Sequence, residues 1–308
     1  MNLTAQPSAS PSLIQRWRRR WWRKDAIALA RFAALTPAVV VTGASEGIGL
    51  AFAKAYARAG RNVVLIARNA HDLEVAAASL VRDDVTGVVA TLALDVTAAD
   101  APARLDAKLA ASGAYVDILV NNAGMGLSGD FAGQPPEAIE SLLALNVGAL
   151  TRLSRHVLPD QLVRGRGGII NIASVGGYLP GPQQAVYYAS KAYVISLSEA
   201  LAAETAGRGV LVMAVAPGVV ETAFHTKMGA NASLLRMILP AHSPRKIVAS
   251  ALIGFYLGHR VVVPGLLNRL IVLAVRALPH RAVAPLVGLL LRPEAQPLTP
   301  PPHRPPSE

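Results

Sequence analysis

Residues 38–49 read AVVVTGASEGIG, and this stretch decides the fold. Its apolar start predicts a buried strand, and the glycines that follow predict a tight turn into a helix that begins near Gly47. Such a turn lets backbone N–H groups approach a pyrophosphate, which the positive end of the helix favours. The spacing is Gly-x-x-x-Gly-x-Gly, and a purely structural turn is the alternative. The residues expected to bind a dinucleotide here are Gly43, Ser45, Gly47, Ile48 and Gly49, the last also packing the helix on the strand.

From residue 38 to about residue 263, short β-branched runs alternate with longer helical stretches. This alternation is typical of repeated βα units and predicts a parallel sheet. The apolar runs lack polar alternation, as expected when helices cover both faces of the sheet. The predicted fold is therefore α/β: a doubly wound, Rossmann-like sheet of about seven strands, in one domain over residues 37–265. The expected strands are 38–42, 62–67, 87–94, 116–121, 168–173, 209–215 and 261–263.

The composition limits the chemistry that this chain can perform. Hydrophobic residues make up 52% of the 308 residues and charged residues 16%, so the chain can bury a large core. It contains no cysteine, which excludes disulfides, thiolate metal sites and a cysteine nucleophile, and no metal site is expected. The lack of cysteine fits a reducing compartment, and a cytoplasmic protein is expected. Redox chemistry would then need a cofactor.

The net charge of +11 is confined to the two ends of the chain. Residues 1–35 hold seven basic residues (Lys or Arg) and one acidic residue, and residues 245–308 hold eight basic and two acidic residues. Residues 36–244 hold fifteen basic and sixteen acidic residues. The body of the chain is therefore near neutral. This distribution argues against nucleic-acid binding.

The N-terminal extension, residues 1–36, carries the sequence RWRRRWWRK at residues 16–24. Interleaved Arg and Trp suit the headgroup level of an anionic membrane, and a solvated basic tail is an equal alternative. A secretory or twin-arginine signal is disfavoured because Arg31 interrupts the apolar run that follows. Peripheral contact with the inner face of a membrane is therefore one expectation.

A C-terminal extension, residues 266–292, is rich in Leu, Val and Ala, but its residues 266–291 hold three arginines and two prolines, which argue against a bilayer-spanning helix. Arg269 and Arg276 are seven residues apart, so the first half is amphipathic. The segment could lie on a membrane, cap the substrate cleft or pack against a second subunit, and packing on protein is the expectation. Residues 293–308 hold seven prolines and predict a disordered tail.

The second predicted strand ends at Ala67, where dinucleotide-binding folds select their cofactor. An acidic residue there would bind the ribose hydroxyls of NAD, but Ala67 is neutral and Arg68 follows. Arg68 can form charge-assisted hydrogen bonds with a 2′-phosphate. NADP(H) is therefore the preferred cofactor and NAD(H) the alternative; Glu46 in the glycine loop weighs against this preference, and a merely solvated Arg68 is the other interpretation.

Tyr187 and Lys191 are four residues apart on a predicted helix and share one face. A phenol has a pKa of about 10, too high for proton transfer near neutrality. A neighbouring ammonium and the positive ring of an oxidised nicotinamide would both lower the pKa of the phenol and make Tyr187 a general acid or base. Tyr188 would need its partner at the position of Ala192.

Several motifs follow one another in a fixed order over roughly residues 38–265. They are Thr42-Gly43-x-x-x-Gly47-Ile48-Gly49, Asp95-Val96, Asn121-Asn122-Ala123-Gly124, Asn146, Ser174, Tyr187-x-x-x-Lys191 and Pro217-Gly218-x-x-x-Thr222. In this order they resemble the short-chain dehydrogenase/reductase family, in the extended-tail group that includes ketoacyl, steroid and retinoid reductases.

The resemblance implies four catalytic residues, of which Tyr187 and Lys191 form the core. Ser174, thirteen residues before Tyr187, would hold the substrate oxygen. Asn146 would pin a water that relays protons to Lys191, with helix capping as its alternative. Lys191 would also hold the nicotinamide ribose.

The resemblance also implies further cofactor contacts. Asp95 would meet the adenine ring, Asn121 would steady the central strands beside the cofactor, and Thr222 would hold the carboxamide. The remaining expected contacts are Val96, Ala123, Gly124, Pro217, Gly218 and Val219.

The sequence thus predicts an NADP(H)-dependent oxidoreductase that moves a hydride between nicotinamide and a carbonyl or secondary alcohol. The substrate lining is expected in residues 223–244, whose apolar side chains favour a lipophilic substrate: Phe224, Met228, Leu234, Leu235, Met237, Ile238 and Leu239. The alternative is a cofactor-binding regulatory or scaffold protein without turnover, against which the intact catalytic set argues. A homo-oligomer is expected by analogy, through helices in 135–163 and 186–206.

Overall fold

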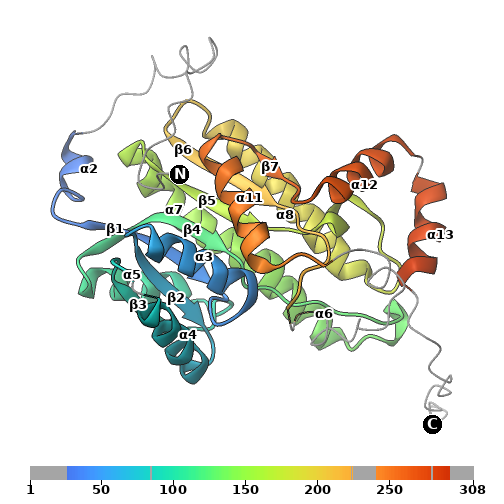
Figure 1. Ribbon diagram of the computed structural model, residues 1–308, viewed down its shortest axis with the longest axis horizontal. Helices are drawn as coiled ribbons and strands as arrows, with labels where there is room; N and C mark the ends of the chain where they lie inside the picture. The colour runs from blue at the N-terminus through green and yellow to red at the C-terminus, as the bar shows by residue number, and fades with distance from the viewer. Residues whose placement is uncertain (1–25, 84, 223, 225–240, 279, 292–308) are drawn as a thin grey trace, which may run out of the picture.

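The computed structural model describes residues 26–83, 85–222, 224, 241–278 and 280–291, and a seven-stranded parallel sheet forms its centre (Figure 1). The strand order is β3-β2-β1-β4-β5-β6-β7, so the chain builds outward from β1 in both directions. The strands are β1 (Thr36–Thr42), β2 (Asn62–Ala67), β3 (Val89–Ala93), β4 (Ala114–Asn121), β5 (Gly167–Ile172), β6 (Val210–Val215) and β7 (Val261–Val262). The predicted doubly wound sheet is confirmed, with every strand boundary within two residues of its expected position.

Helices cover both faces of the sheet because consecutive strand residues point to opposite sides. In β1, Val39 and Val41 pack with the first helical layer, while Val40 packs with the second. The first layer is α3 (Gly47–Arg58), α4 (Ala70–Arg82) and α11 (Pro244–Tyr256). The second layer is α5 (Ala101–Ala111), α7 (Leu150–Arg164) and α8 (Ala185–Glu204).

A chain of buried amide and hydroxyl groups ties the central strands to the second layer. The Nδ2 of Asn121 donates to Asn171 Oδ1 at 2.9 Å and to Ser154 Oγ at 3.0 Å. Asn171 in turn donates to Ser198 Oγ at 2.9 Å. Since Ser154 lies on α7 and Ser198 on α8, this network fixes both helices relative to β4 and β5. Buried polar groups of this kind are costly unless they are all paired, so the network specifies one packing arrangement.

The segment before α7 is not a regular α-helix. A π-helix, η2 (Ala144–Ala149), joins α6 (Pro136–Leu143) to α7 without a break. A π turn adds a residue to the helical repeat and turns its side chains relative to those of the flanking helices. Here it directs the buried Asn146 toward the loop after β4, where it hydrogen-bonds Met125.

The described part of each extension is helical. At the N-terminal side it is α2 (Ala26–Ala30), and the predicted basic Trp/Arg segment lies outside the described residues. At the C-terminal side it comprises α12 (Leu266–Ala277) and α13 (His280–Leu291), which Figure 1 shows at the end of the molecule remote from α2. Within the described ranges, no helix is long and apolar enough to cross a bilayer. The proline-rich tail also lies outside these ranges.

Candidate active site

A cavity of about 840 Å³ opens at the carboxyl ends of the strands, where the strand order reverses between β1 and β4. Ligands of open α/β sheets bind at this switch point. The cavity is lined by these residues that the sequence predicted: Gly43, Ser45, Gly47, Ile48, Arg68, Asp95, Val96, Ala123, Gly124, Ser174, Tyr187, Lys191, Pro217, Gly218, Val219 and Thr222. Three other predicted residues, Gly49, Asn121 and Asn146, lie behind this lining.

The glycine loop after β1 has the shape of a phosphate cradle. Gly43 and Gly47 have φ angles of +62° and +59°, a left-handed conformation that favours glycine. A Cβ at Gly47 would lie 3.1 Å from Cγ2 of Thr222, so the loop approaches the opposite wall closely. The loop leads into the N-terminus of α3, whose partial positive charge favours anions. These residues therefore fit a dinucleotide pyrophosphate.

Gly49 allows α3 to pack closely and does not line the cavity. A Cβ there would lie 2.2 Å from the carbonyl oxygen of Gly43, which no side chain can accommodate. The absence of a side chain lets the first turn of α3 sit directly on the end of β1. The sequence predicted this packing role together with a cofactor contact, and the placement supports the packing role.

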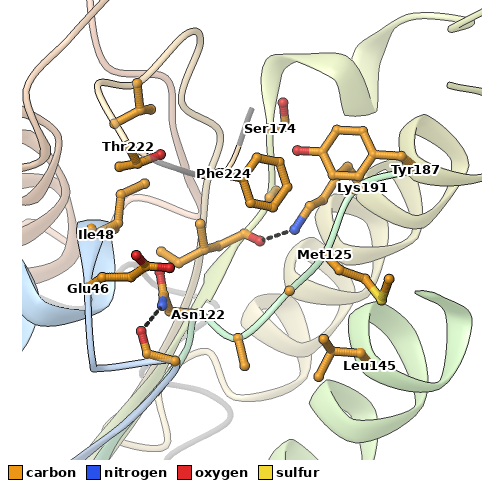
Figure 2. Close-up of a pocket in the computed structure, with 18 of the residues that line it drawn as sticks. Glu46, Ile48, Asn122, Met125, Leu145, Ser174, Tyr187, Lys191, Thr222 and Phe224 are labelled. Atoms are coloured by element: carbon orange, nitrogen blue, oxygen red, sulfur yellow. Dashed lines mark hydrogen bonds between the residues drawn. The ribbon is translucent and has the colours of Figure 1, made fainter. Parts of the chain in front are cut away.

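Asn122 is a site residue to which the sequence analysis gave no role, although it stands in the motif Asn121-Asn122-Ala123-Gly124. Its Nδ2 donates to the carbonyl oxygens of Thr42 and Gly43, both at 2.9 Å (Figure 2). Its own N–H donates to Thr42 Oγ1 at 3.0 Å. Asn122 thus joins the end of β4 to the glycine loop. The adjacent pair Asn121-Asn122 was a usable signal, because neighbouring residues of a strand face opposite ways and only one of them can meet the loop.

The far end of the cavity gathers Arg68 and Asp95 after β2 and β3. Thr97 lowers the pKa of the Asp95 carboxyl through a hydrogen bond from its hydroxyl and another from its N–H, and the positive charge of Arg68 lowers that pKa further. Arg68 and Asp95 are therefore close enough to interact electrostatically. The arrangement can hold a polar ring against Asp95 and an anion against Arg68.

The opposite end holds Ser174, Tyr187 and Lys191, which point toward one another in Figure 2. Ser174 follows β5, and its Oγ accepts from the N–H of Gly176 at 3.1 Å. Its hydroxyl is also close enough to the Tyr187 phenol to lower the pKa of that phenol. Lys191 lies one turn after Tyr187 on α8, with its Nζ 5.7 Å from the centre of the Tyr187 ring. That Nζ donates to the carbonyl oxygen of Ile172 at 2.9 Å. The three predicted side chains are thus brought together from β5 and α8.

Burial shifts the acid–base behaviour of this group. It raises the pKa of Tyr187 to about 12, against a lowering by the hydrogen bond with Ser174. It also lowers the pKa of the Lys191 ammonium to about 8. In the protein alone, loss of hydration disfavours the phenolate and raises the pKa of the phenol. The lowering expected from Lys191 together with an oxidised nicotinamide stays a prediction.

Tyr188 has a packing role. Its ring fills the space above two glycines, since a Cβ on Gly181 would lie 2.3 Å from the Tyr188 Cγ, and one on Gly176 would lie 3.1 Å from its ring. Burial raises the pKa of Tyr188. No amine faces it at the position of Ala192, as the sequence indicates. Tyr187 is therefore the phenol with the neighbours that proton transfer requires.

Asn146 holds the loop after β4 from behind. Its Oδ1 accepts from the N–H of Met125 at 2.9 Å, and its Nδ2 donates to the Met125 carbonyl at 2.8 Å and to Ser190 Oγ at 3.1 Å. The side-chain amide is thus fully engaged in positioning Met125. The proton relay through a water to Lys191 stays a prediction.

The substrate side of the cavity is apolar and includes the C-terminal extension. Phe224, with its ring 5.8 Å from that of Tyr187, lines it as predicted. The other predicted lining residues, Met228, Leu234, Leu235, Met237, Ile238 and Leu239, lie outside the described residues. Leu291 of α13 lines the cavity, and three residues of that helix pack with Tyr187, Tyr188 and Leu142 of α6: Val283, Val287 and Leu291. The sequence left open whether the C-terminal extension lies on a membrane, caps the substrate cleft or packs against a second subunit. In the structure its helix α13 caps the cleft.

Comparisons with known proteins identify the family. Residues 37–233 match the family model described as short chain dehydrogenase. The chain belongs to the short-chain dehydrogenase family. It is accordingly an oxidoreductase that acts on CH–OH or C=O groups with a nicotinamide cofactor.

Individual relatives differ in what they act on. The chain is 37% identical over 220 residues to galactitol 2-dehydrogenase (L-tagatose-forming) from Cereibacter sphaeroides, covering 69% of this chain and 85% of that protein. It is 32% identical over 217 residues to the very-long-chain 3-oxoacyl-CoA reductase of Bos taurus, covering 69% of this chain and 66% of that protein. A solved short-chain dehydrogenase from Sphingobium yanoikuyae, in complex with NADPH, matches with a TM-score of 0.69 and 37% identity over 78% of this chain and 93% of that one.

The role of Asn122 leads to a first prediction. Asn122→Ala leaves the Thr42 and Gly43 carbonyls without their donor, a loss of about 1–3 kcal/mol that should weaken NADPH binding about tenfold. Fluorescence titration with NADPH measures the dissociation constant. The matched control is Asn62→Ala, which loses a bond from the Val88 N–H outside the cavity and should bind like the parent. Equal dissociation constants for the two variants would contradict the assignment.

The lowered pKa of Lys191 leads to a second prediction. Lys191 carries its charge below pH 8 and loses it as the pH rises through about 8. The hydrogen bonds to ribose hydroxyls that the resemblance implies for it should therefore weaken in the same range. The affinity for NADPH, titrated from about pH 6 to about pH 10, should fall with a midpoint near that pKa. Lys191→Met should bind weakly throughout and show no such step. An affinity of the parent that stays level across this range would rule out the charged role.

Proposed function

We propose that this short-chain dehydrogenase reduces the carbonyl of a lipophilic substrate with NADPH, and that it runs the reverse oxidation with NADP⁺. The observation that carries the proposal is the cavity itself. It joins an arginine-lined end at Arg68 to a Ser174, Tyr187 and Lys191 cluster with an apolar wall beside it. A dinucleotide laid along the glycine loop would present its nicotinamide at that cluster.

In the reductive direction, NADPH when bound supplies the hydride that adds to the carbonyl carbon. Tyr187 donates its phenolic proton to the oxygen as negative charge develops there. Its pKa of about 12 keeps the phenol protonated at neutral pH, which is the form needed for donation. Ser174 holds the same oxygen through its hydroxyl, and the Lys191 ammonium stabilises the phenolate left after the transfer.

The preference for NADP(H) rests on the end of β2. Ala67 offers no carboxylate to a ribose diol, and Arg68 lines the cavity next to it. A 2′-phosphate placed there would receive charge-assisted hydrogen bonds from the guanidinium. The relative from Sphingobium yanoikuyae, solved with NADPH, lends support from outside this chain.

The lipophilic substrate is inferred from the wall opposite the glycine loop. Met125, Leu145, Phe224 and Leu291 come from four separate segments and meet around the Tyr187 end of the cavity (Figure 2 labels the first three). Gln184 also lines the cavity and is 5% exposed, a polar group that can orient a second oxygen of the substrate. An apolar wall with few polar groups suits a hydrophobic chain that carries its carbonyl near one end. The 3-oxoacyl-CoA reductase relative acts on substrates of this kind.

The central test compares two neighbouring phenols. Tyr187→Phe removes the proton donor and should lower kcat for NADPH-dependent ketone reduction by about 10²–10⁴-fold while NADPH still binds. Tyr188→Phe, equally deep in the protein, should keep most of its activity. Equal rates for the parent and Tyr187→Phe would exclude the mechanism. NADPH binding without consumption by the parent would instead favour a regulatory or scaffold protein of the same fold.

Cofactor preference is tested at Arg68. Arg68→Ala should raise the dissociation constant of NADPH about 10- to 100-fold and leave that of NADH nearly unchanged, because only the former carries the 2′-phosphate. Isothermal titration with each nucleotide measures both constants. Arg58→Ala, which removes an exposed arginine of α3 paired with Asp83, serves as the control. A parent protein that binds NADH more tightly than NADPH would overturn the preference.

The substrate class is tested with methyl ketones of increasing length. Each additional buried CH₂ contributes about 0.8 kcal/mol, so kcat/KM should rise about fourfold per carbon until the wall is filled. Leu291→Ala should flatten this rise, whereas Leu289→Ala, on the same helix but 52% exposed and outside the main cavity, should not. Turnover of small polar carbonyls alone would end the lipophilic assignment.

A further inference from the structure

Helix α12 presents a stripe of leucines that no described part of the chain covers. Leu266, Leu270 and Leu273 are 73%, 53% and 67% exposed and lie at i, i+4 and i+7, so they share one face of the helix. Leu267 and Leu278 widen the stripe, at 44% and 49% exposed. Single exposed leucines are ordinary, but a contiguous row on one helix marks a surface made for contact.

The opposite face of α12 is fixed to the body of the protein. Asn268 is buried, donates to the Pro264 carbonyl at 2.7 Å, and lies against Gly218 beside the active-site cavity, where a Cβ would come within 2.5 Å of its amide. Arg276 extends over the ring of Tyr178 at 4.9 Å. These contacts set the rotation of the helix about its axis. The leucines therefore face outward because Asn268 faces inward, while Arg276 stays exposed beside the Tyr178 ring.

The charged residues of the segment that carries this stripe have one sign, and the acidic Glu199 of α8 lies near Tyr178 on the anchored side. Residues 244–291 contain no Asp or Glu, whereas their six basic residues are Arg245, Lys246, Arg260, Arg269, Arg276 and Arg281. The two arginines of α12 itself and Arg281 at the start of α13 are exposed. A leucine stripe bordered by arginines is the pattern of a helix that lies in the plane of an anionic membrane surface. Basic side chains there meet lipid phosphates, and leucines enter the boundary of the acyl chains.

We infer that α12 docks this protein on an anionic lipid surface through Leu266, Leu270 and Leu273. The alternative is that a second copy of the chain covers the leucine stripe, and the positive charge beside the stripe argues against this. Pairing the same face of two copies would bring the arginines of both together with no acidic residue of residues 244–291 to offset them. The inference rests on α12 and the basic residues of the same segment, and it does not depend on the proposed reaction.

A local probe tests the inference on the full chain. Because the protein contains no cysteine, Leu270→Cys gives a single site for an environment-sensitive NBD fluorophore. On vesicles of equimolar phosphatidylglycerol and phosphatidylcholine, its emission should shift to the blue and gain intensity about two- to threefold. Phosphatidylcholine vesicles should give little change. The matched control is Val81→Cys on α4, 67% exposed and far from the stripe, which should not respond even if another segment tethers the protein to lipid.

Removing positive charge tests the electrostatic part. In the labelled Leu270→Cys background, Arg281→Gln should raise the lipid concentration at half-maximal response about fivefold at low salt. Three results would overturn the inference: no response at position 270, an equal response at position 81, or a response to protein concentration without vesicles, which would indicate a second copy. Ketone reduction by Leu270→Cys in the absence of lipid should match the parent, so loss of docking and loss of activity are distinguishable.

Discussion

A buried hydrogen bond from the Lys191 ammonium to the main-chain carbonyl of Ile172 holds the centre of this protein together. The lysine is 6% exposed, and an ammonium so far from water is unfavourable unless it is paired. The bond fixes α8 against the end of β5, and Tyr187 one turn earlier is fixed with it. The same burial that makes the bond necessary also lowers the pKa of Lys191 to about 8.

The polar interior around that bond gives the site its rigidity. Asn121 and Asn171 pair across β4 and β5 and reach Ser154 and Ser198 on the two covering helices. A slip of either helix would leave several buried groups unpaired, at a cost of about 1–3 kcal/mol each. The positions of β5 and α8, which carry Ser174 and Tyr187, are thus set in part by this network, whose members lie outside the cavity lining. Asn122, which itself lines the cavity, fixes the glycine loop to the end of β4.

The cavity divides into two halves with different origins. The cofactor half is built from loops at the carboxyl ends of the strands, where main-chain groups and short side chains predominate. The apolar half draws on the loop after β4, the π-helical turn, Phe224 and the last residue of α13. The shape of the cofactor half follows from the parallel sheet. The shape of the apolar half depends on how the segments outside the sheet pack over the cavity. Differences between relatives in what they act on are expected to arise in the apolar half.

The sequence by itself determined the seven strands, their parallel winding, the glycine turn and the grouping of Ser174, Tyr187 and Lys191. The strands, the turn and the pairing of Tyr187 with Lys191 follow from local signals: apolar runs, glycines that permit a positive φ, and a four-residue spacing on one helix. The inclusion of Ser174 follows from the resemblance to the family. Only the tertiary structure decided that Asn122 holds the loop while Asn121 faces the core. It also decided that burial raises the pKa of Tyr187, and that α13 caps the cleft with Leu291. Each of these depends on which distant segments exclude water from a group, and no short stretch of sequence carries that information.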